Sequence, residues 1–440
     1  MNSKFTSALS LLLLSAAFVA CKKDQQSQNQ QQQSYNVQLV TQKTLGSTYK
    51  DGIISMAPAL DGGILLTGLT NYVGSSQTYQ GDAWIVKLNS NGDTIWTRAL
   101  GGANYDGAFS AVATSDGGYV VAAETHSNKS GYVGTNHGGS DWWIIKLKNN
   151  GDTAWTKLIG TTIDEYPTSI AITPDGGFAV CGYSIDLNGN QDVMVAKLNS
   201  SGNVVWQKKL GGTGDDSGNT LAVSSEGSIL IAGTTESNNS GDVGASHGMD
   251  DAWVIKLNSN GDKVWTKLLG GIKDDWASSI KSTSDGGCLI AGTTSNSENG
   301  DVTGKNHGNN DVWIVKLNAS GDITWNSLLG GAQYDGVADY SQIAITTDGG
   351  YIIAGYSTSS DGDVAANKGG EDLWVLKLNS SGQKLWSKTF GGSGFDEASG
   401  VIVNADGSFW VAGNTESNNN GDVGTIHGLM DGWLIKVKDN

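Results

Sequence analysis

The stretch GDVGASHGMDDAW, residues 241–253, places His247 among carboxylates in a glycine-rich loop, an arrangement that could hold a metal ion. Zn²⁺ takes three or four nitrogen or sulfur ligands and Ca²⁺ takes six to eight oxygens, whereas this loop offers a single imidazole. Related loops recur along the chain, and one of them has Lys in place of His, which argues against metal ligation there. The recurring residues, each four positions before the Asp of an Asp-x-Trp motif, are His137, His247, His307, Lys368 and His427.

We therefore interpret the recurring loops as structural elements. In this interpretation the loop carboxylates accept backbone N–H bonds inside their turns, and the Asp of Asp-x-Trp does the same at the start of a strand. No cofactor is then required, and weak binding of Ca²⁺ by the loop carboxylates is the alternative. The loop carboxylates are Asp242, Asp301, Asp363 and Asp422.

A second set of acids follows strand-like segments that end in Leu, Ile or Phe, always at a spacing of six residues. Aromatic residues neighbour several of these acids, and carboxylates beside aromatic rings commonly hold sugars or cationic groups. The alternative is that each acid caps its local Leu-Gly-Gly turn. The acids are Asp51, Asp106, Glu165, Asp216, Asp275, Asp335 and Asp396, and the neighbouring aromatic residues are Tyr105, Tyr166, Trp276, Tyr334 and Phe395.

Seven repeats position these residues. Each repeat carries Asp-x-Trp, degenerate at Asp192–Met194, and an Asp-Gly-Gly turn or a variant of it. Segments such as 278–284, 288–294, 253–258 and 263–269 are short, β-rich and joined by tight turns, with no helical periodicity. The pattern predicts an all-β fold, a seven-bladed β-propeller of four-stranded antiparallel blades. Twelve Trp residues recur at fixed repeat positions, and we expect them in the core.

The last repeat lacks its fourth strand, whereas VTQKTLGS, residues 40–47, matches the fourth-strand pattern. We expect the N-terminal strand to complete the last blade, giving a monomeric propeller over residues 36–440 with no open sheet edge. In such a ring the seven acids would surround the mouth of the central channel. They would share that face with the long loops between the second and third strands.

Residues 1–20 have the layout of a secretory signal, with Lys4, an apolar run and small residues before Cys21. The ending FVAC resembles a bacterial lipobox, which implies cleavage before Cys21 and acylation of its thiol. The Gln-rich residues 21–35 have nothing apolar to bury and predict a disordered tether. We expect a lipid-anchored protein of the outer membrane, because Lys22 rather than Asp follows the cysteine; whether it faces the periplasm or the outside stays open.

Two repeats depart from the pattern. The sixth has three extra residues, which should place Asp339 and Tyr340 near the channel, and insertions on a rigid repeat often carry specificity. The third has Met194 in place of Trp, Pro167 early, and a short loop over 184–192. The alternative for the sixth repeat is that its extra residues form a tolerated bulge without a function. The alternative for the third is that it has lost repeat residues without gaining a function.

Composition excludes several functions. The chain has one arginine, Arg98, and a net charge of −17, so phosphate or nucleic-acid recognition is not expected. His126 is the one His outside the recurring loops, and no Ser-His-Asp set is evident. Carboxylate pairs are abundant, so glycoside hydrolysis stays open, although no pair is unique. Cys181 and Cys288 are expected to be buried, unpaired thiols.

The repeat GDVG..HG..D.W..KLN..GD..W.K.LGG resembles that of secreted and lipid-anchored bacterial β-propellers, most of which have no assigned activity. The resemblance implies the architecture and carries no catalytic residues. We expect a non-catalytic binding or assembly module of an outer-membrane lipoprotein, docking a protein complex through its loop-rich face. A glycan-binding surface lipoprotein is the alternative, followed by a carbohydrate-active hydrolase or lyase.

Overall fold

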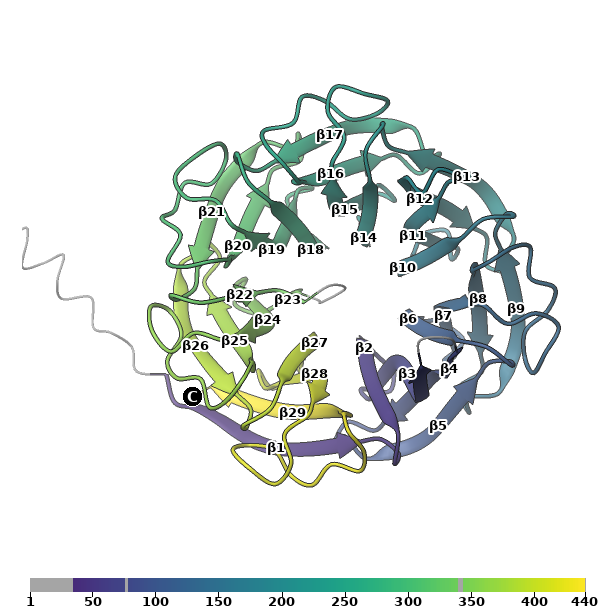
Figure 1. Cartoon of the computed structure of the whole chain (residues 1–440), viewed down its shortest axis with the longest axis horizontal. Helices are drawn as coiled ribbons and strands as arrows, with labels where there is room; N and C mark the ends of the chain where they lie inside the picture. Colours follow the sequence, from purple (N-terminus) through teal and green to yellow (C-terminus); the bar gives the residue numbers. More distant parts are fainter. Residues whose placement is uncertain (1–34, 76–77, 339–342, 440) are drawn as a thin grey trace, which may run out of the picture. The chain divides into compact units, whose positions relative to one another are not determined.

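The computed structural model describes residues 35–75, 78–338 and 343–439. Residues 38–438 form one compact unit, and of the remainder only 35–37 and 439 are described. The regular structure of the described residues is β throughout, in seven sheets whose neighbouring strands are antiparallel (Figure 1). The described residues contain no helix long and apolar enough to cross a membrane.

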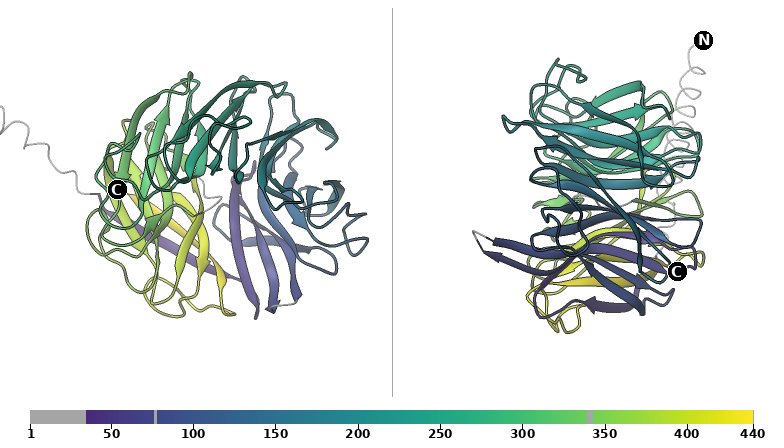
Figure 2. Two further views of the ribbon diagram at one scale, coloured as in Figure 1. Left: turned by 45° about the horizontal axis from the view of Figure 1, so that its top comes forward. Right: turned by 90° about the vertical axis from the view of Figure 1, so that its right-hand side faces the viewer.

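The sheets succeed one another around a central channel, and each contributes its first strand to the channel wall. Figure 2 shows the same succession from two other directions. From blade 1 to blade 4 the strands are β2 (Lys50–Pro58), β3 (Ile64–Ser75), β4 (Thr78–Leu88) and β5 (Thr94–Leu100); β6 (Asp106–Ala113), β7 (Tyr119–Thr125), β8 (Asp141–Leu147) and β9 (Thr153–Ile159); β10 (Glu165–Ile172), β11 (Phe178–Ile185), β12 (Gln191–Leu198) and β13 (Val204–Leu210); β14 (Asp216–Val223), β15 (Ile229–Thr235), β16 (Asp251–Leu257) and β17 (Lys263–Leu269).

Blades 5 to 7 repeat this order, except that the inner strand of blade 6 is split into two short pieces. Blade 7 takes its outermost strand from the other end of the chain. The strands are β18 (Asp275–Ser282), β19 (Cys288–Thr294), β20 (Asp311–Leu317) and β21 (Ile323–Leu329); β22 (Asp335–Gly336), β23 (Ile343–Ile345), β24 (Tyr351–Ser357), β25 (Asp372–Leu378) and β26 (Lys384–Phe390); β27 (Asp396–Val403), β28 (Phe409–Thr415), β29 (Asp431–Asp439) and β1 (Val37–Leu45).

The predicted closure is confirmed, because β1 pairs with β29 and completes blade 7. Side chains strengthen this junction: Trp433 Nε1 donates a hydrogen bond to Gln42 Oε1 at 3.2 Å, across 391 residues of sequence. The ring therefore has no unpaired strand between its first and last blades, which is how closed β structures avoid pairing with other chains.

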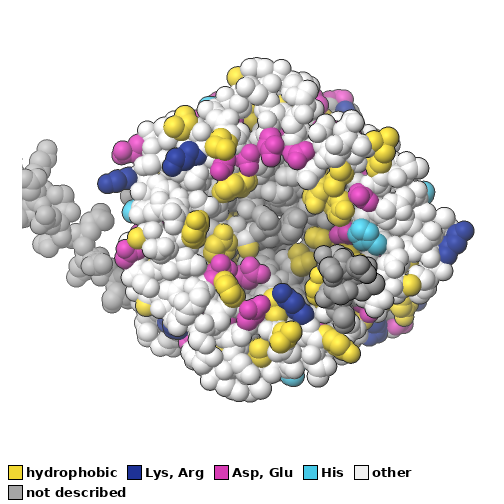
Figure 3. Space-filling view, in the orientation of Figure 1, with side chains coloured by type: hydrophobic (Ala, Val, Ile, Leu, Met, Phe, Trp, Pro, Cys, Tyr) yellow, Lys and Arg dark blue, Asp and Glu magenta, His cyan; other side chains and the backbone are white. Residues whose placement is uncertain are grey.

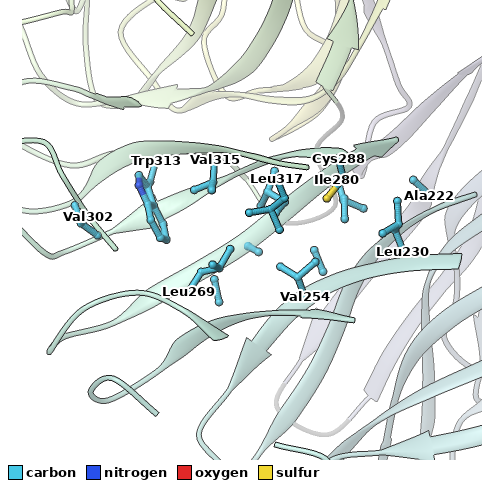
Figure 4. Close-up of a cluster of buried hydrophobic side chains, with 14 of the residues drawn as sticks. Ala222, Leu230, Val254, Leu269, Ile280, Cys288, Val302, Trp313, Val315 and Leu317 are labelled. Carbon is cyan, nitrogen blue, oxygen red and sulfur yellow. The ribbon is translucent and has the colours of Figure 1, made fainter. Parts of the chain in front are cut away.

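The hydrophobic core lies between blades. In Figure 4, Trp313, Val315 and Leu317 of β20 face Val254 and Leu269 of the preceding blade. Strand alternation explains this, since every second residue of a strand points to the same face of the sheet. The Asp-x-Trp tryptophans are at most 8% exposed, and in blade 3 Met194 fills the same position at 3%.

Of the six tryptophans in the second recurring set, Trp386 is buried at 7% exposed, and the other five are partly buried and pack against the hydrophobic core. The others lie against the turn of the next blade. A Cβ added to Gly202, whose φ is +77°, would lie 2.5 Å from the Trp155 ring. Glycine is needed at that turn both for its backbone conformation and for the close approach of the indole.

The two ends of the channel carry different connections. We call one end the loop face; it holds the long loops between second and third strands, such as 236–250, and the links between blades. We call the other end the turn face; it holds the tight Asp-Gly-Gly turns, such as 285–287, and the turns before the outermost strands.

Candidate functional site

The seven recurring acids lie at the loop face, but their carboxylates are buried, with at most 1% of each residue exposed. Asp106 illustrates their role. Its Oδ2 accepts hydrogen bonds from the Gly102 N–H at 2.7 Å and the Ser127 hydroxyl at 2.8 Å, and its Oδ1 accepts from Thr125. The acid thus ties the Leu-Gly-Gly turn to the end of the second strand.

This geometry corresponds to the capping role left open by the sequence: the acids lie at the start of the inner strands at the loop face, and their carboxylates are bound within their own blades. A ligand-binding role for them at the channel mouth stays a prediction. The strand register explains why the Asp106 side chain points into its own blade. Asp106 pairs with Thr125 of the neighbouring strand, so hydroxyl donors of the same blade lie close to its carboxylate. A backbone N–H of the inter-blade turn binds an equivalent carboxylate oxygen in each blade. The seven acids are Asp51, Asp106, Glu165, Asp216, Asp275, Asp335 and Asp396.

A second carboxylate, from the Asp-x-Trp motif or its degenerate copy, approaches each of these junctions, and at five of the seven it is buried. A Cβ on Gly270 would lie 2.4 Å from Asp275 Oδ2 and 2.8 Å from Asp251 Oδ1. The Asp251 Oδ1 atom has no hydrogen-bond partner among the described residues. Burial raises the pKa of Asp275 to about 6, and the nearby Asp251 adds to the effect. Burial likewise raises the pKa of Asp372, the Asp-x-Trp acid of blade 6, to about 6. In both acids, burial and the neighbouring carboxylates disfavour the charged form.

The recurring His or Lys loops hold the start of the third strand. Asp141 Oδ2 accepts the backbone N–H of His137 at 3.0 Å and lies 2.7 Å from its Nδ1. The same backbone bond recurs at His247, His307, Lys368 and His427. Within the described residues, no group of three or more His, Cys, Asp or Glu side chains is placed to hold a metal ion. Weak Ca²⁺ binding by the loops stays a prediction.

A cavity of about 1010 Å³ opens at the loop-face mouth between blades 1, 2 and 7. Its polar lining includes Lys50, Glu124 and His126. Glu124 is buried at 4% exposed, and its Oε1 lies 2.6 Å from His126 Nε2. The hydrogen bond with Glu124 raises the pKa of His126. Tyr105 lies edge-on to the imidazole with ring centroids 5.9 Å apart. The mouth therefore combines a hydrogen-bonded Glu–His pair, an aromatic ring and a lysine.

A second cavity of about 460 Å³ adjoins the first through shared residues Ile53, Ile54 and Asn414. Two carboxyl groups, Glu371 and Glu397, line it. Burial and the charge of Glu397 raise the pKa of Glu371 to about 7.

The environments of the two carboxyl groups differ. The Asn414 amide donates to Glu397 Oε1 at 3.1 Å, while Asn414 Oδ1 accepts the Ile53 N–H at 2.7 Å. A carboxyl group with a raised pKa, such as Glu371, can donate a proton or bind a hydroxyl group.

The predicted aromatic positions have different surroundings. Tyr334 and Phe395 are exposed at 53% and 59%. Tyr166 stacks on Tyr183 with centroids 5.0 Å apart, and Trp276 donates to Asp250 Oδ2 at 3.1 Å. Tyr334 and Phe395 thus present the most open ring surfaces. Figure 3 shows acidic side chains gathered in two groups beside the central hollow.

Several predicted residues fall outside this description. Cys21, Asp339 and Tyr340 lie outside the described residues. Cys181 and Cys288 are buried, free thiols, as predicted, and burial raises the pKa of each to about 12.

Sequence reasoning missed Glu124, Glu371, Glu397 and Asn414. It gave His126 no role. The signal was the segment AAETHS, residues 122–127, where blade 4 has AGTTES, residues 232–237. Glu124 occupies the strand position of Thr234, so a charged residue stands where the repeat has a hydroxyl.

The loop face also carries isolated, exposed apolar side chains. They lie on the loops and links of blades 3, 4 and 7, and each is well separated in sequence from the others. They are Leu187 at 92%, Met249 at 64%, Ile272 at 66% and Leu429 at 81% exposed.

No family model matches the chain. Over 422 residues it is 25% identical to the regulatory protein FlaEY of Caulobacter vibrioides. The alignment covers 86% of this chain and 43% of the relative, so the chain spans less than half of that protein's length.

Similar solved structures include the WD40 domain of Neurospora crassa Pan2, with 9% identity, a TM-score of 0.45, and coverage of 91% and 95% of the two chains. A protein of unknown function from Dyadobacter fermentans has 10% identity, a TM-score of 0.45, and coverage of 92% and 99%. The assignment of the propeller rests on the strand pairing of this chain itself.

Proposed function

We propose that the chain is the non-catalytic binding module of an outer-membrane lipoprotein, anchored through Cys21, which docks a protein complex through its loop face. The observation that supports this most directly is the set of exposed apolar side chains on the loop face. Apolar side chains that project from a closed, rigid framework are typical anchors of protein interfaces. The regulatory role in the name of the Caulobacter relative accords with binding.

The acids of the loop face would add specificity. Asp215, Asp250 and Asp274 act together to raise the pKa of Glu236, after the effect of burial, so this side of the face concentrates negative charge. A basic patch on the partner would relieve that repulsion and speed association. Raised salt should therefore slow association more than it changes dissociation.

The test is affinity purification of the lipidated protein from its own membrane in mild detergent, followed by mass spectrometry. A stoichiometric outer-membrane partner is expected, and the variant Met249→Asp with Leu429→Asp should lose it. Leu60→Asp is the matched control, because Leu60 is 68% exposed in a tight turn of the opposite face. Equal loss with Leu60→Asp, or retention by the double variant, would contradict docking through the loop face.

A second candidate is glycan capture at the mouth. The cavity of about 1010 Å³ carries Tyr105 beside polar groups, a combination that suits a sugar ring and its hydroxyls. Recovery of the protein alone would favour this candidate. A polysaccharide array would then be screened, with Tyr105→Ala expected to lose binding. Cleavage of a bound glycan that Glu371→Gln abolishes would favour the hydrolase instead.

A further inference from the structure

A cavity of about 340 Å³ lies at the junction of blades 7 and 1, beside the link between these blades at the loop face. We call it the blade-1 pocket. Trp84 of the Asp-x-Trp motif lines it, together with Gly46 of the link and Ala99 of β5. Ala99 is exposed, whereas the equivalent Leu268 of blade 4 is partly covered. The wall of the pocket is therefore open in blade 1 and covered in blade 4.

The long loop of blade 4 covers the equivalent place in that blade. The Asp242 N–H donates a hydrogen bond to the carbonyl oxygen of Gly211 in the preceding link at 2.8 Å. Val243 is 5% exposed and belongs to the same core cluster as Trp253. Five blades have such a buried valine in the long loop, and these residues are Val133, Val243, Val302, Val364 and Val423.

The strand register identifies the blade-1 pocket as the same place. Trp84 pairs with Ala99 across β4 and β5. In blade 4, Trp253 pairs with Leu268 across β16 and β17. Gly46 directly follows the outermost strand of the preceding blade, as the link glycine of blade 4 does. The pocket is therefore the place that a valine loop fills in five other blades, and Ala99 makes it larger than a leucine would.

Blade 1 uses its connecting segment differently. Its second and third strands continue as a hairpin, in which β3 pairs with β4 as far as Ser75 and Thr78. In blade 4 the ladder between the corresponding strands ends at Thr235 and Asp251, and the long loop begins there. In the right-hand view of Figure 2 the hairpin of blade 1 stands out from the ring. The segment that folds back as a valine loop in blade 4 is thus extended strand in blade 1.

The loops of the other blades show what a ligand of the pocket must contain. Gly241, which precedes Asp242, has a φ of +56°, and a Cβ added to it would lie 2.0 Å from the Gly211 carbonyl oxygen. Glycine is therefore required at the first position. The second residue donates its backbone N–H to the link, and it is Tyr132 in blade 2, so its side chain is not fixed. The third residue buries an aliphatic side chain.

We propose that the blade-1 pocket binds a turn of the docking partner with the sequence Gly-x-aliphatic. The N–H of its second residue would donate to the Gly46 carbonyl oxygen, and its aliphatic side chain would lie against Trp84. Ala99 leaves room for Ile or Leu in place of Val. This inference rests on the proposed docking function and names the chemistry of one of its contacts.

The pocket is continuous with the docking surface proposed above. Leu429 is 81% exposed, and its loop touches the link that forms the pocket wall. A Cβ added to Gly428 would lie 2.0 Å from the Tyr49 carbonyl oxygen of that link. A partner that packs on Leu429 therefore reaches the pocket without crossing another blade.

The test is NMR titration of the intact protein with a cyclic peptide that copies residues 236–250 and carries Val243→Ile. A cyclic peptide suits this loop, because its ends meet where β15 pairs with β16. We expect the indole N–H signal of Trp84, assigned with Trp84→Phe, to shift. Peptides with Gly241→Ala or Val243→Ser should bind at least about tenfold more weakly, since the first collides with the link and the second loses its aliphatic contact.

Two variants of the protein locate the site. Ala99→Trp fills the pocket and should abolish peptide binding. Lys209→Trp, at the equivalent strand position of blade 3, is the matched control and should leave binding unchanged. Thermal unfolding verifies that both variants fold. The proposal would be overturned if the peptide left the Trp84 signal unshifted, or if it bound Ala99→Trp as tightly as the parent.

Partner capture separates the pocket from the docking function. Ala99→Trp should weaken retention of the outer-membrane partner during affinity purification, whereas Lys209→Trp should not. Retention by Ala99→Trp, with loss from the variant that combines Met249→Asp and Leu429→Asp, would overturn the pocket proposal and leave docking through the loop face intact. Retention by both would contradict docking through the loop face itself.

Discussion

The two faces of the ring differ in how their carboxyl groups are paired with positive charge. On the turn face, Lys146 lies 2.8 Å from Asp116, and the strongly exposed acid is neutralised by a nearly buried lysine. On the loop face, Glu371 and Glu397 share a cavity that no lysine or arginine among the described residues lines, and the pKa of Glu371 rises to about 7. The turn-face pair is thus stabilised at neutral pH, whereas the two glutamates of the loop face retain unrelieved charge. Unrelieved charge and strongly perturbed pKa values are features of functional sites.

The largest effect should come from the core that both faces share. Trp374 is fully buried between blades, and Trp374→Ala should lower the free energy of unfolding by about 3–5 kcal/mol. Trp374→Phe should cost much less, because the indole N–H has no hydrogen-bond partner in the described part of the chain. Urea unfolding measures both variants. Similar losses in the two would show that the indole N–H matters after all.

Matched lysine variants should separate the two faces. Lys87 is 1% exposed, and its Nζ donates to Asp61 and to the Leu88 carbonyl at 2.8 Å. Lys87→Met should lower the free energy of unfolding by about 1–3 kcal/mol, because it leaves a buried carbonyl without its donor. Lys50→Met at the loop-face mouth should change it by less than about 0.5 kcal/mol. If the two variants lowered the free energy of unfolding equally, the lysines of the two faces would not differ in their contribution to stability.

The acids of the two faces should also lose their contributions to stability in opposite directions of pH. The folded-state pKa values of Asp275 and Asp372 are raised to about 6, so their stabilising contribution is complete below about 3.8 and is lost as pH rises through 6. Between pH 5 and 7.5 each should cost about 1 kcal/mol.

On the turn face the pKa values of Asp116 and Asp175 are lowered to about 2, chiefly by hydrogen bonds from Lys146 and Lys197. Their contribution is present above 3.8 and is lost only as pH falls toward 2, and it is small because these acids are exposed. Urea unfolding across pH 4.5–7.5 should show stability falling with pH, with a shallower slope in Asp275→Asn. A flat or rising profile would contradict the buried acids as its source.

The smallest effect on stability should come from Tyr334→Ala. The side chain is 53% exposed at the mouth, so the free energy of unfolding should change by less than about 0.5 kcal/mol. If the mouth binds a glycan or a partner, affinity should fall while the melting temperature stays constant. A large drop in melting temperature would instead make Tyr334 a structural residue.

The sequence predicted the architecture well because its signals are periodic. Asp-x-Trp marks each third strand, and the unmatched strand at residues 40–47 predicts the closure. The site was harder to predict. Spacing located Asp106 at the correct strand end, but its orientation depends on hydroxyl donors of Thr125 and Ser127, which only the folded register brings near. Glu371 and Glu397 belong to different blades, so no local pattern links them.

The pairing of β1 with β29 has a consequence for biosynthesis. Because the first strand of the propeller pairs with one that is made almost 390 residues later, blade 7 stays incomplete while the intervening blades emerge. During that interval β1 is unpaired and can associate with neighbouring nascent chains. A slow final ring-closing step follows, since so distant a contact carries a large loop-closure entropy. The nascent protein is therefore most dependent on holding chaperones until β29 has been made.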